Sequence, residues 1–210
     1  MKIVAVSDTH NKYKDLILPE GDMLIHSGDL DVFNFSSEVK DFNKWLKKQS
    51  FKYKIIVAGN HDKYAQINNQ NTRTMLKDSC IYLENSGTEI EGIKIWGSPY
   101  SPRFGSWFFM AERGEDIKRY WDLIPKDTNI LITHGPAYGI LDIVPFPKPE
   151  HVGCSDLLNK VKEIKPRLHI FGHIHDCYGI KQIEETTFIN ASLLNEDYQL
   201  VNKPIIYDYT

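Results

Sequence analysis

Five short apolar runs, each followed within two or three residues by Asp, His or Asn, are the feature that most constrains the fold of this 210-residue chain. The runs occupy residues 3–6, 23–26, 55–58, 130–132 and 169–171, and most of their residues are Ile, Val or Leu. Short apolar runs bounded by glycine or turn residues are typical of strands buried on both faces, as at the centre of α/β sheets. We therefore expect an α/β fold built on these five strands.

The polar residues at the ends of these runs predict a metal site. In α/β sheets, ligands bind beyond the carboxyl ends of the strands, so residues far apart in sequence would meet at one edge. Carboxylate, amide and imidazole groups are the side chains that bind transition metals. The residues concerned are Asp8, His10, Asp29, Asn60, His61, His134, His173 and His175.

The spacing within these clusters favours two metal ions over one. Asp8 and His10 are two residues apart, as are His173 and His175, so each pair can point to the same side of an extended chain. Asp29 follows a glycine that permits a tight turn, and its two carboxylate oxygens can bridge two cations. The ligands exceed what one tetrahedral ion needs and suit two ions about 3.5–4 Å apart. Ligands without sulfur favour Mn first, with Fe, Zn, Ni, Co or Mg as alternatives, over Ca or a cysteine-bound zinc.

Composition limits the remaining classes of protein. The length suits a single domain over residues 1–210, and no apolar stretch is long enough to cross a bilayer. The net charge of −3 argues against a partner as long and negatively charged as a nucleic acid. The N-terminal residues show no secretory signal, and three cysteines are an odd number without metal-ligand spacing, so we expect a cytoplasmic protein.

Between the five runs the sequence predicts helices over residues 36–49, capped by Ser36 or Ser37, and over residues 63–79, 115–123 and 155–164. Residues 81–96 predict an antiparallel meander, and the region around positions 180, 188 and 205 predicts further strands. Residues 97–114 are rich in proline, glycine and aromatic side chains, which predicts a long irregular loop of the kind that usually serves function.

Taken in order, the motifs resemble those of the calcineurin-like metallophosphoesterase superfamily. They are Asp8-x-His10, Gly28-Asp29, Gly59-Asn60-His61-Asp62, Thr133-His134-Gly135 and Gly172-His173-x-His175. Each motif alone is weak, but five in order over residues 8–175 are specific. The stretches 93–99, 134–142 and 168–175 further resemble the small MPPED-type branch, which contains phosphodiesterases active on small and cyclic nucleotides.

The resemblance implies a four-layer αββα sandwich with mixed central sheets. It also implies one metal held by Asp8, His10, Asp29 and His175, and a second held by Asp29, Asn60, His134 and His173. His61 would then donate a proton or hydrogen bond at the scissile phosphate. The sequence departs from the phosphoprotein-phosphatase branch, because Leu30-Asp31-Val32-Phe33 replaces the Val-Asp-Arg-Gly continuation and Asp62 stands where that branch has Glu. These departures argue against a protein phosphatase and leave the residue that orients His61 unassigned.

Four residues of the aromatic loop are candidates for substrate contact. Trp107 and Phe108 can stack on a nucleobase, or they can fasten the loop to the core. Arg103 and Arg113 flank them and can reach a phosphate, although lone arginines are more often solvated. His26 and His169 belong to apolar runs and are expected to be packed, whereas His151 follows a proline-rich loop and is a further, weaker candidate.

The function predicted from the sequence is a binuclear metal-dependent phosphodiesterase acting on small or cyclic nucleotides. Attack would come in line from a hydroxide bridging the two ions, and His61 would assist the leaving oxygen. The alternatives are a nuclease or phosphomonoesterase using the same site, or a binding module of the same fold that has lost catalysis. The sequence argues against the last, because every motif ligand is present.

Overall fold

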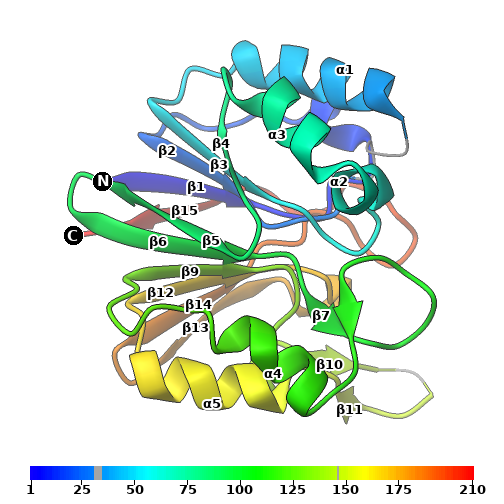
Figure 1. The fold of residues 1–210 in the computed structure, drawn as a ribbon, viewed down its shortest axis with the longest axis vertical. Helices are drawn as coiled ribbons and strands as arrows, with labels where there is room; N and C mark the ends of the chain where they lie inside the picture. Colours follow the sequence, from blue (N-terminus) through cyan, green and yellow to red (C-terminus); the bar gives the residue numbers. More distant parts are fainter. Residues whose placement is uncertain (31–34, 146) are drawn as a thin grey trace.

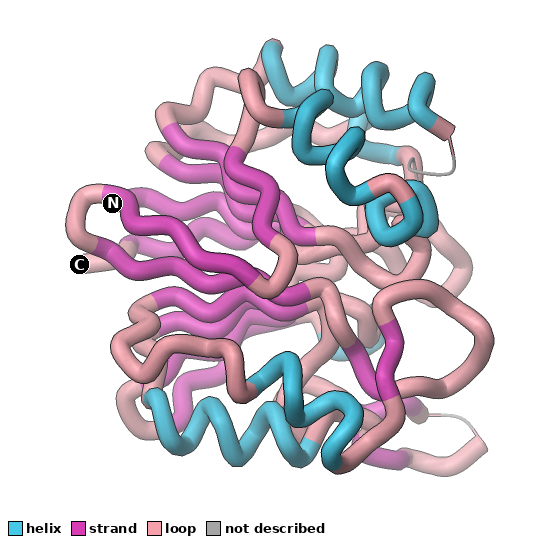
Figure 2. Tube along the Cα trace, viewed as in Figure 1, coloured by secondary structure: helices cyan, strands magenta, loops and turns pink. Residues whose placement is uncertain are grey.

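A computed structural model of the chain, which describes residues 1–30, 35–145 and 147–210, has two β-sheets packed face to face with helices on both outer faces. Figure 1 shows α1, α2 and α3 above one sheet and α4 and α5 below the other, and Figure 2 shows the strands forming the two middle layers. The predicted four-layer αββα sandwich is confirmed. Of the helices in the described ranges, none has the length and apolarity needed to span a membrane.

The first sheet has the strand order β15-β1-β2-β3-β4. Its strands are β1 (Lys2–Val6), β2 (Met23–His26), β3 (Tyr53–Val57), β4 (Ile81–Leu83) and β15 (Ile205–Asp208). β1, β2, β3 and β4 run parallel, and β15 pairs antiparallel with β1. The carboxyl ends of the first three motif strands therefore lie at one edge of the sheet.

The second sheet has the order β13-β14-β12-β9-β6-β5. Its strands are β5 (Ser86–Ile90), β6 (Ile93–Ser98), β9 (Ile130–Thr133), β12 (Leu168–Phe171), β13 (Gly179–Ile183) and β14 (Thr186–Asn190). The four inner strands are parallel, and the two outer strands are antiparallel to their neighbours. Two short pairs, β7 (Ser101–Pro102) with β8 (Met110–Ala111) and β10 (Ile143–Val144) with β11 (Glu150–His151), lie outside both sheets.

Side chains along each central strand point alternately to the two faces of the sheet, and because both faces are buried the five runs are continuously apolar. In β1, Ile3 and Ala5 face the layer between the sheets, whereas Val4 and Val6 pack under the helices. The helices above the first sheet are α1 (Ser36–Lys47), α2 (Lys63–Ile67) and α3 (Asn69–Leu76), and those below the second are α4 (Glu115–Trp121) and α5 (Ser155–Ile164). Each central strand thus buries both of its faces.

Several predicted elements need correction. Residues 81–96 do not form an antiparallel meander: β4 joins the first sheet parallel to β3, and only β5 and β6 form a hairpin. Leu83 packs between the sheets and Tyr82 under the helices, so β4 is buried on both faces like its parallel neighbour. The stretch 63–79 is two helices separated at Asn68, whose ψ of 45° is not helical.

The first helix also begins and ends differently from the prediction. Neither Ser36 nor Ser37 is its N-cap; Phe35 occupies that position, and its backbone N–H donates to the Glu38 carboxylate at 2.8 Å. The helix ends at Lys47 instead of residue 49. The helix predicted over residues 155–164 has the predicted bounds, and the one predicted over 115–123 ends at Trp121.

The layer between the sheets should carry much of the stability. Ile170 is fully buried there, whereas Ile180 on the edge strand β13 is 53% exposed. Ile170→Ala should lower the free energy of unfolding by about 2–5 kcal/mol, and Ile180→Ala by no more than about 0.5 kcal/mol. Urea denaturation of both variants measures the difference, and equal losses would contradict this account of the core.

Candidate metal centre

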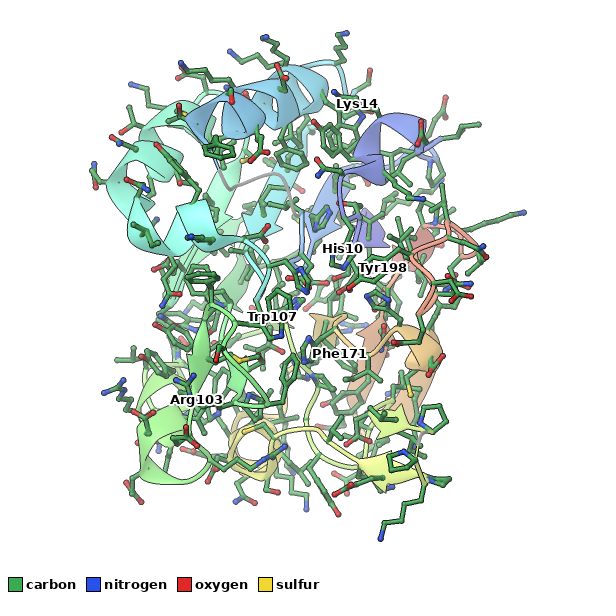
Figure 3. All side chains as sticks on the ribbon, turned by 90° about the vertical axis from the view of Figure 1, so that its right-hand side faces the viewer. His10, Lys14, Arg103, Trp107, Phe171 and Tyr198 are labelled. Atoms are coloured by element: carbon green, nitrogen blue, oxygen red, sulfur yellow. The ribbon has the colours of Figure 1, made fainter. Side chains whose placement is uncertain are left out.

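All eight predicted polar residues meet where the carboxyl ends of the two sheets adjoin. Loops after β1, β2 and β3 supply Asp8 and His10, Asp29, and Asn60 and His61, and loops after β9 and β12 supply the other histidines. A parallel bridge between Ser7 and Ser192 joins the ends of β1 and β14 across the two sheets. Figure 3 views this end of the molecule, with His10 near the junction.

The backbone turns sharply at the ligand positions. Asp8, His10, Asp29 and His173 have φ values of 52°, 38°, 53° and 71°, in the left-handed region that non-glycine residues rarely adopt. The Asp8 N–H donates to the carbonyl oxygen of Gly28 at 2.9 Å, and the His10 N–H to that of Asp29 at 3.1 Å. Strained residues that cluster in this way are typical of functional sites, where the surrounding structure holds them in place.

The side chains form two neighbouring donor groups. In one, donor atoms of Asp8, His10 and His175 all lie within 4.8 Å of one another. In the other, Asp29, His134 and His173 do the same. A third group of His10, Asp29 and His61 meets the same limit and connects Asp29 to the first group, in agreement with the ligand sets that the family resemblance implies.

Asp29 reaches both groups through its two oxygens. Its Oδ1 lies 3.3 Å from Nε2 of His134, and its Oδ2 lies 3.8 Å from Nε2 of His10. Asn60 adds a neutral oxygen to the second group, with Oδ1 at 2.8 Å from Nε2 of His134. The carboxylate of Asp29 is therefore placed between the two groups, as a bridging ligand would be.

The hydrogen bonds of two histidines show that the donor set fits a metal. Nδ1 of His134 lies 3.1 Å from the carbonyl oxygen of Ser27, and Nδ1 of His175 lies 3.1 Å from that of Asn195. A carbonyl oxygen only accepts, so Nδ1 carries the proton and Nε2 presents a lone pair to the centre. Nε2 of His134 then faces two oxygen acceptors, an arrangement that requires a proton or a metal cation between them.

The electrostatics of the centre also favour a bound cation. Burial alone would lower the pKa of His134, but the charge of Asp29, its hydrogen bond with Asp29 and the charge of Asp8 together outweigh burial and raise that pKa to about 9. Burial also lowers the pKa of His175, but the hydrogen bond that its ring donates to the Asp8 carboxylate and the charge of that carboxylate raise this pKa to about 9. Although burial favours the neutral acid, the nearby histidines hold the pKa of Asp8 and Asp29 below their ordinary values. A cation that binds Nε2 displaces its proton, so metal binding should release protons and weaken as pH falls.

Glycines allow the loops to approach closely. A Cβ atom on Gly172 would collide with the Asp8 carboxylate, and one on Gly59 would collide with the Asp29 carboxylate. Gly28 has a φ of 118°, and a Cβ there would strike the ring of His134. These contacts explain why three of the motifs pair a glycine with a candidate ligand: no other residue leaves room for the side chains to converge.

His61 lies at the edge of the centre. Its backbone N–H donates to Oδ1 of Asp29 at 2.9 Å, which fixes the main chain of His61 beside that carboxylate. Its ring stacks on Trp107 with centroids 4.2 Å apart and meets the ring of His10 edge-on at 4.8 Å. A donor atom of His61 also lies within 4.8 Å of donor atoms of His10 and Asp29. The geometry therefore permits a substrate-facing role and leaves a ligand role to be tested.

Asp62 connects two of the loops that carry candidate ligands. Its buried carboxylate accepts the N–H of Gly59 at 2.8 Å and that of Leu30 at 3.2 Å. This carboxylate thus holds together the loops that carry Asn60 and Asp29.

The structure also identifies contributors that the sequence analysis missed. The Ser192 hydroxyl donates to Oδ2 of Asp8 at 2.9 Å, and the Asn195 carbonyl accepts from His175. Phe104, Glu196 and Tyr198 line the cleft over the ligands. Ser192 follows the buried strand β14, whose residues Thr-Thr-Phe-Ile-Asn are only partly apolar, so the pattern that revealed the other five clusters was weak here.

The predicted substrate contacts are only partly at the cleft. Trp107 lines it, whereas Phe108 packs against the core under the first helix layer. Arg103 pairs with Glu112 at 2.6 Å, and Figure 3 shows it well away from His10. Arg113 donates to the carbonyl oxygens of Val152 and Gly153 at 2.6 and 2.7 Å. Neither arginine lines the cleft, so this structure does not support their assignment as phosphate contacts.

The two histidines that were expected to be packed in the core, without a role at the site, are buried there. His26 and His169 are fully buried, and burial lowers the pKa of each to about 3, so both are neutral packed residues. His151, the weaker candidate, pairs through Nδ1 with Asp142 at 2.6 Å and does not line the described part of the cleft.

Two facing sheets between helical layers, with a histidine and carboxylate centre at their junction, define a metal-binding hydrolase fold of the phosphoesterase class. The model of the calcineurin-like phosphoesterase family matches residues 1–177, and the chain belongs to that family, whose members bind divalent metals. It is 42% identical to human metallophosphoesterase domain-containing protein 1 over 99% of this chain and 70% of that protein. It is 36% identical to a UPF0046 protein of Caenorhabditis elegans over 99% of this chain and 74% of that protein.

Solved structures agree on the fold. One crystal structure superposes with a TM-score of 0.67 at 15% identity, covering 90% of this chain and 89% of that one. The crystal structure of TT1561 of Thermus thermophilus superposes with a TM-score of 0.57 at 16% identity, covering 90% and 88%.

Replacement of Asp29 should reduce metal content more than replacement of any other ligand, because its oxygens reach both donor groups. Asp29→Ala should weaken binding at both positions by more than about 100-fold, since even residues that only support ligands contribute 10–100-fold. Asp8→Ala should mainly affect one position. Elemental analysis after dialysis measures this, and two tightly held metals in Asp29→Ala would refute the bridging assignment.

Proposed function

We propose that the protein is a binuclear metal-dependent phosphodiesterase that hydrolyses small or cyclic nucleotides. The observation that supports this most is the pair of donor groups with the Asp29 carboxylate between them and His61 beside them. Two divalent cations, when bound, would supply Lewis-acid neutralisation of the phosphoryl oxygens and a water of lowered pKa. Manganese is the metal we expect first.

The protein's own residues would position the cations and the proton donor. Asp8 is held by Ser192 and the His173 N–H, and His134 and His175 are held by backbone carbonyls, so the ligands need little rearrangement to bind. His61, with its main chain anchored to Asp29 and its ring against Trp107, would donate a proton to the leaving oxygen.

The size and charge of the cleft support a small substrate over a polymer. Its volume is about 190 Å³, below the range of typical ligand pockets, and its described lining contains no Lys or Arg. A nuclease would need basic side chains along the path of a polynucleotide backbone. The sequence after Asp29 lacks the Val-Asp-Arg-Gly continuation of the phosphoprotein phosphatases, which argues against a protein substrate.

A substrate panel tests the proposal. After reconstitution with Mn, and separately with the alternative metals, the purified protein should hydrolyse a bis-aryl phosphodiester and 2′,3′- or 3′,5′-cyclic nucleotides. Diester kcat/KM should exceed that of a monoester with the same aryl leaving group. A monoester preference across several metals would favour the phosphomonoesterase alternative, and cleavage of long single strands at comparable rates would favour a nuclease.

His61 should act on rate without holding metal. A positioned general acid contributes about 10²–10⁴-fold, so His61→Ala should lower kcat by about that factor while metal content stays at the wild-type level. The defect should shrink for a diester whose leaving group is too acidic to need a proton.

Two other histidines provide the controls. His134→Ala should lose metal as well as rate, and His151→Ala, outside the cleft, should leave both unchanged. Metal loss in His61→Ala, or the same defect with good and poor leaving groups, would show that His61 is a ligand or a structural residue.

A further inference from the structure

A turn formed by residues 195–199 lies over the metal centre, although it follows the part of the chain that matches the family model. That match ends at residue 177. The ring of Tyr198 lies 4.8 Å from that of His10 and 5.7 Å from that of His175, and Figure 3 shows Tyr198 beside His10. Glu196 and Tyr198 both line the cleft. The family model therefore does not cover this wall of the site.

The turn is held in one conformation by Asn195. Its side-chain oxygen accepts the N–H groups of Asp197 at 3.1 Å and Gln199 at 2.8 Å, and its own N–H donates to the Gln199 carbonyl at 3.0 Å. Tyr198 has a φ of 57°, a left-handed conformation that a tyrosine adopts only where its surroundings impose it. Because the Asn195 carbonyl also accepts from His175, the turn and the metal ligand are positioned together.

The charge of the cleft is unusual for a site that receives an anion. Its lining contains the carboxylates of Asp29 and Glu196 but no Lys or Arg among the described residues. The undescribed positions 31–34 and 146 are Asp, Val, Phe, Asn and Phe, so they add no basic side chain. Bound metal ions would neutralise Asp29, which is a candidate ligand, whereas Glu196 lines the cleft outside the candidate donor groups. An additional negative charge on the substrate would therefore meet Glu196, whose own charge no Lys or Arg of the described lining offsets.

We propose that Glu196 and Tyr198 determine the specificity of this site. Tyr198, 44% exposed beside the ligands, offers its ring for contact with an aromatic group of the substrate such as a nucleobase. Glu196 disfavours the dianion of a phosphomonoester relative to the monoanion of a phosphodiester. The inference rests on the proposed phosphodiesterase function and assigns its selectivity to residues outside the family match.

A matched pair of variants tests the role of Glu196. Glu196→Gln and Asp197→Asn each remove one negative charge from the same turn, but only Glu196 lines the cleft. With Mn-loaded protein, Glu196→Gln should raise kcat/KM for an aryl phosphomonoester relative to the matching diester by about two- to fivefold, the range of an exposed charge interaction. The ratio should stay unchanged in Asp197→Asn, and 1 M salt should reduce the effect by screening, at roughly a 3 Å Debye length.

A second pair tests Tyr198. Tyr198→Leu should raise KM for a nucleotide diester by about tenfold, which is in the range of base–aromatic stacking. With the same metal bound, KM for a methyl aryl diester whose aryl group is the leaving group should stay nearly unchanged. Tyr198→Phe keeps the ring and should restore the nucleotide KM. Metal content and melting temperature of each variant should equal those of the wild type.

The outcomes separate this inference from the function on which it rests. Wild-type protein that hydrolyses no diester with any metal would overturn the proposed function. If the wild type is an active diesterase, equal selectivity changes in Glu196→Gln and Asp197→Asn would overturn only the role of Glu196. Equal losses on both diesters in Tyr198→Leu, with metal lost, would show that Tyr198 supports His10 and His175 and does not bind substrate.

Discussion

The burial of two carboxylates at the junction of the sheets is the constraint on which the rest of the centre depends. Asp8 and Asp29 are almost completely shielded from solvent, and an ionised carboxylate in such a place requires cationic or hydrogen-bonding partners. Asp8 receives the His173 N–H, the Ser192 hydroxyl and the His175 ring; Asp29 receives the His61 N–H and the His134 ring. These partners come from both sheets, so the site exists only because the carboxyl ends of the sheets meet.

The same constraint explains the strained backbone and the glycines around the ligands. Strands 4–5 residues long end at the junction, and the chain must reverse within one or two residues to point a carboxylate back between the sheets. Left-handed φ values at Asp8, His10, Asp29 and His173 provide that reversal. Each such residue costs about 1–3 kcal/mol, which the fully buried layer between the sheets offsets.

The sequence predicted the parts of this protein that follow from local pattern. Continuous apolar runs indicate strands buried on both faces, so the central strands were predictable. The candidate ligands follow these runs within a few residues, so their convergence at the ends of the strands was predictable too. β4 was misassigned because three residues carry no signal of which sheet they join; packing of Tyr82 and Leu83 on opposite faces decides it. The partner of Arg103 was unpredictable for a similar reason, since only the fold shows that Glu112 lies close enough to pair with it.

The residues after the family match complete the centre instead of merely extending the fold. β14 is parallel to β12, so its carboxyl end arrives at the same junction and delivers Ser192 to Asp8 and Asn195 to His175. The chain then returns through β15, which pairs with β1, the strand that carries Asp8. The segment that orients one donor group is thereby tied to both sheets. The same segment places Glu196 and Tyr198 on the cleft wall, so a change in the backbone of this turn would alter both the proposed selectivity and the geometry of the donor group. A change confined to the two side chains would alter the selectivity alone.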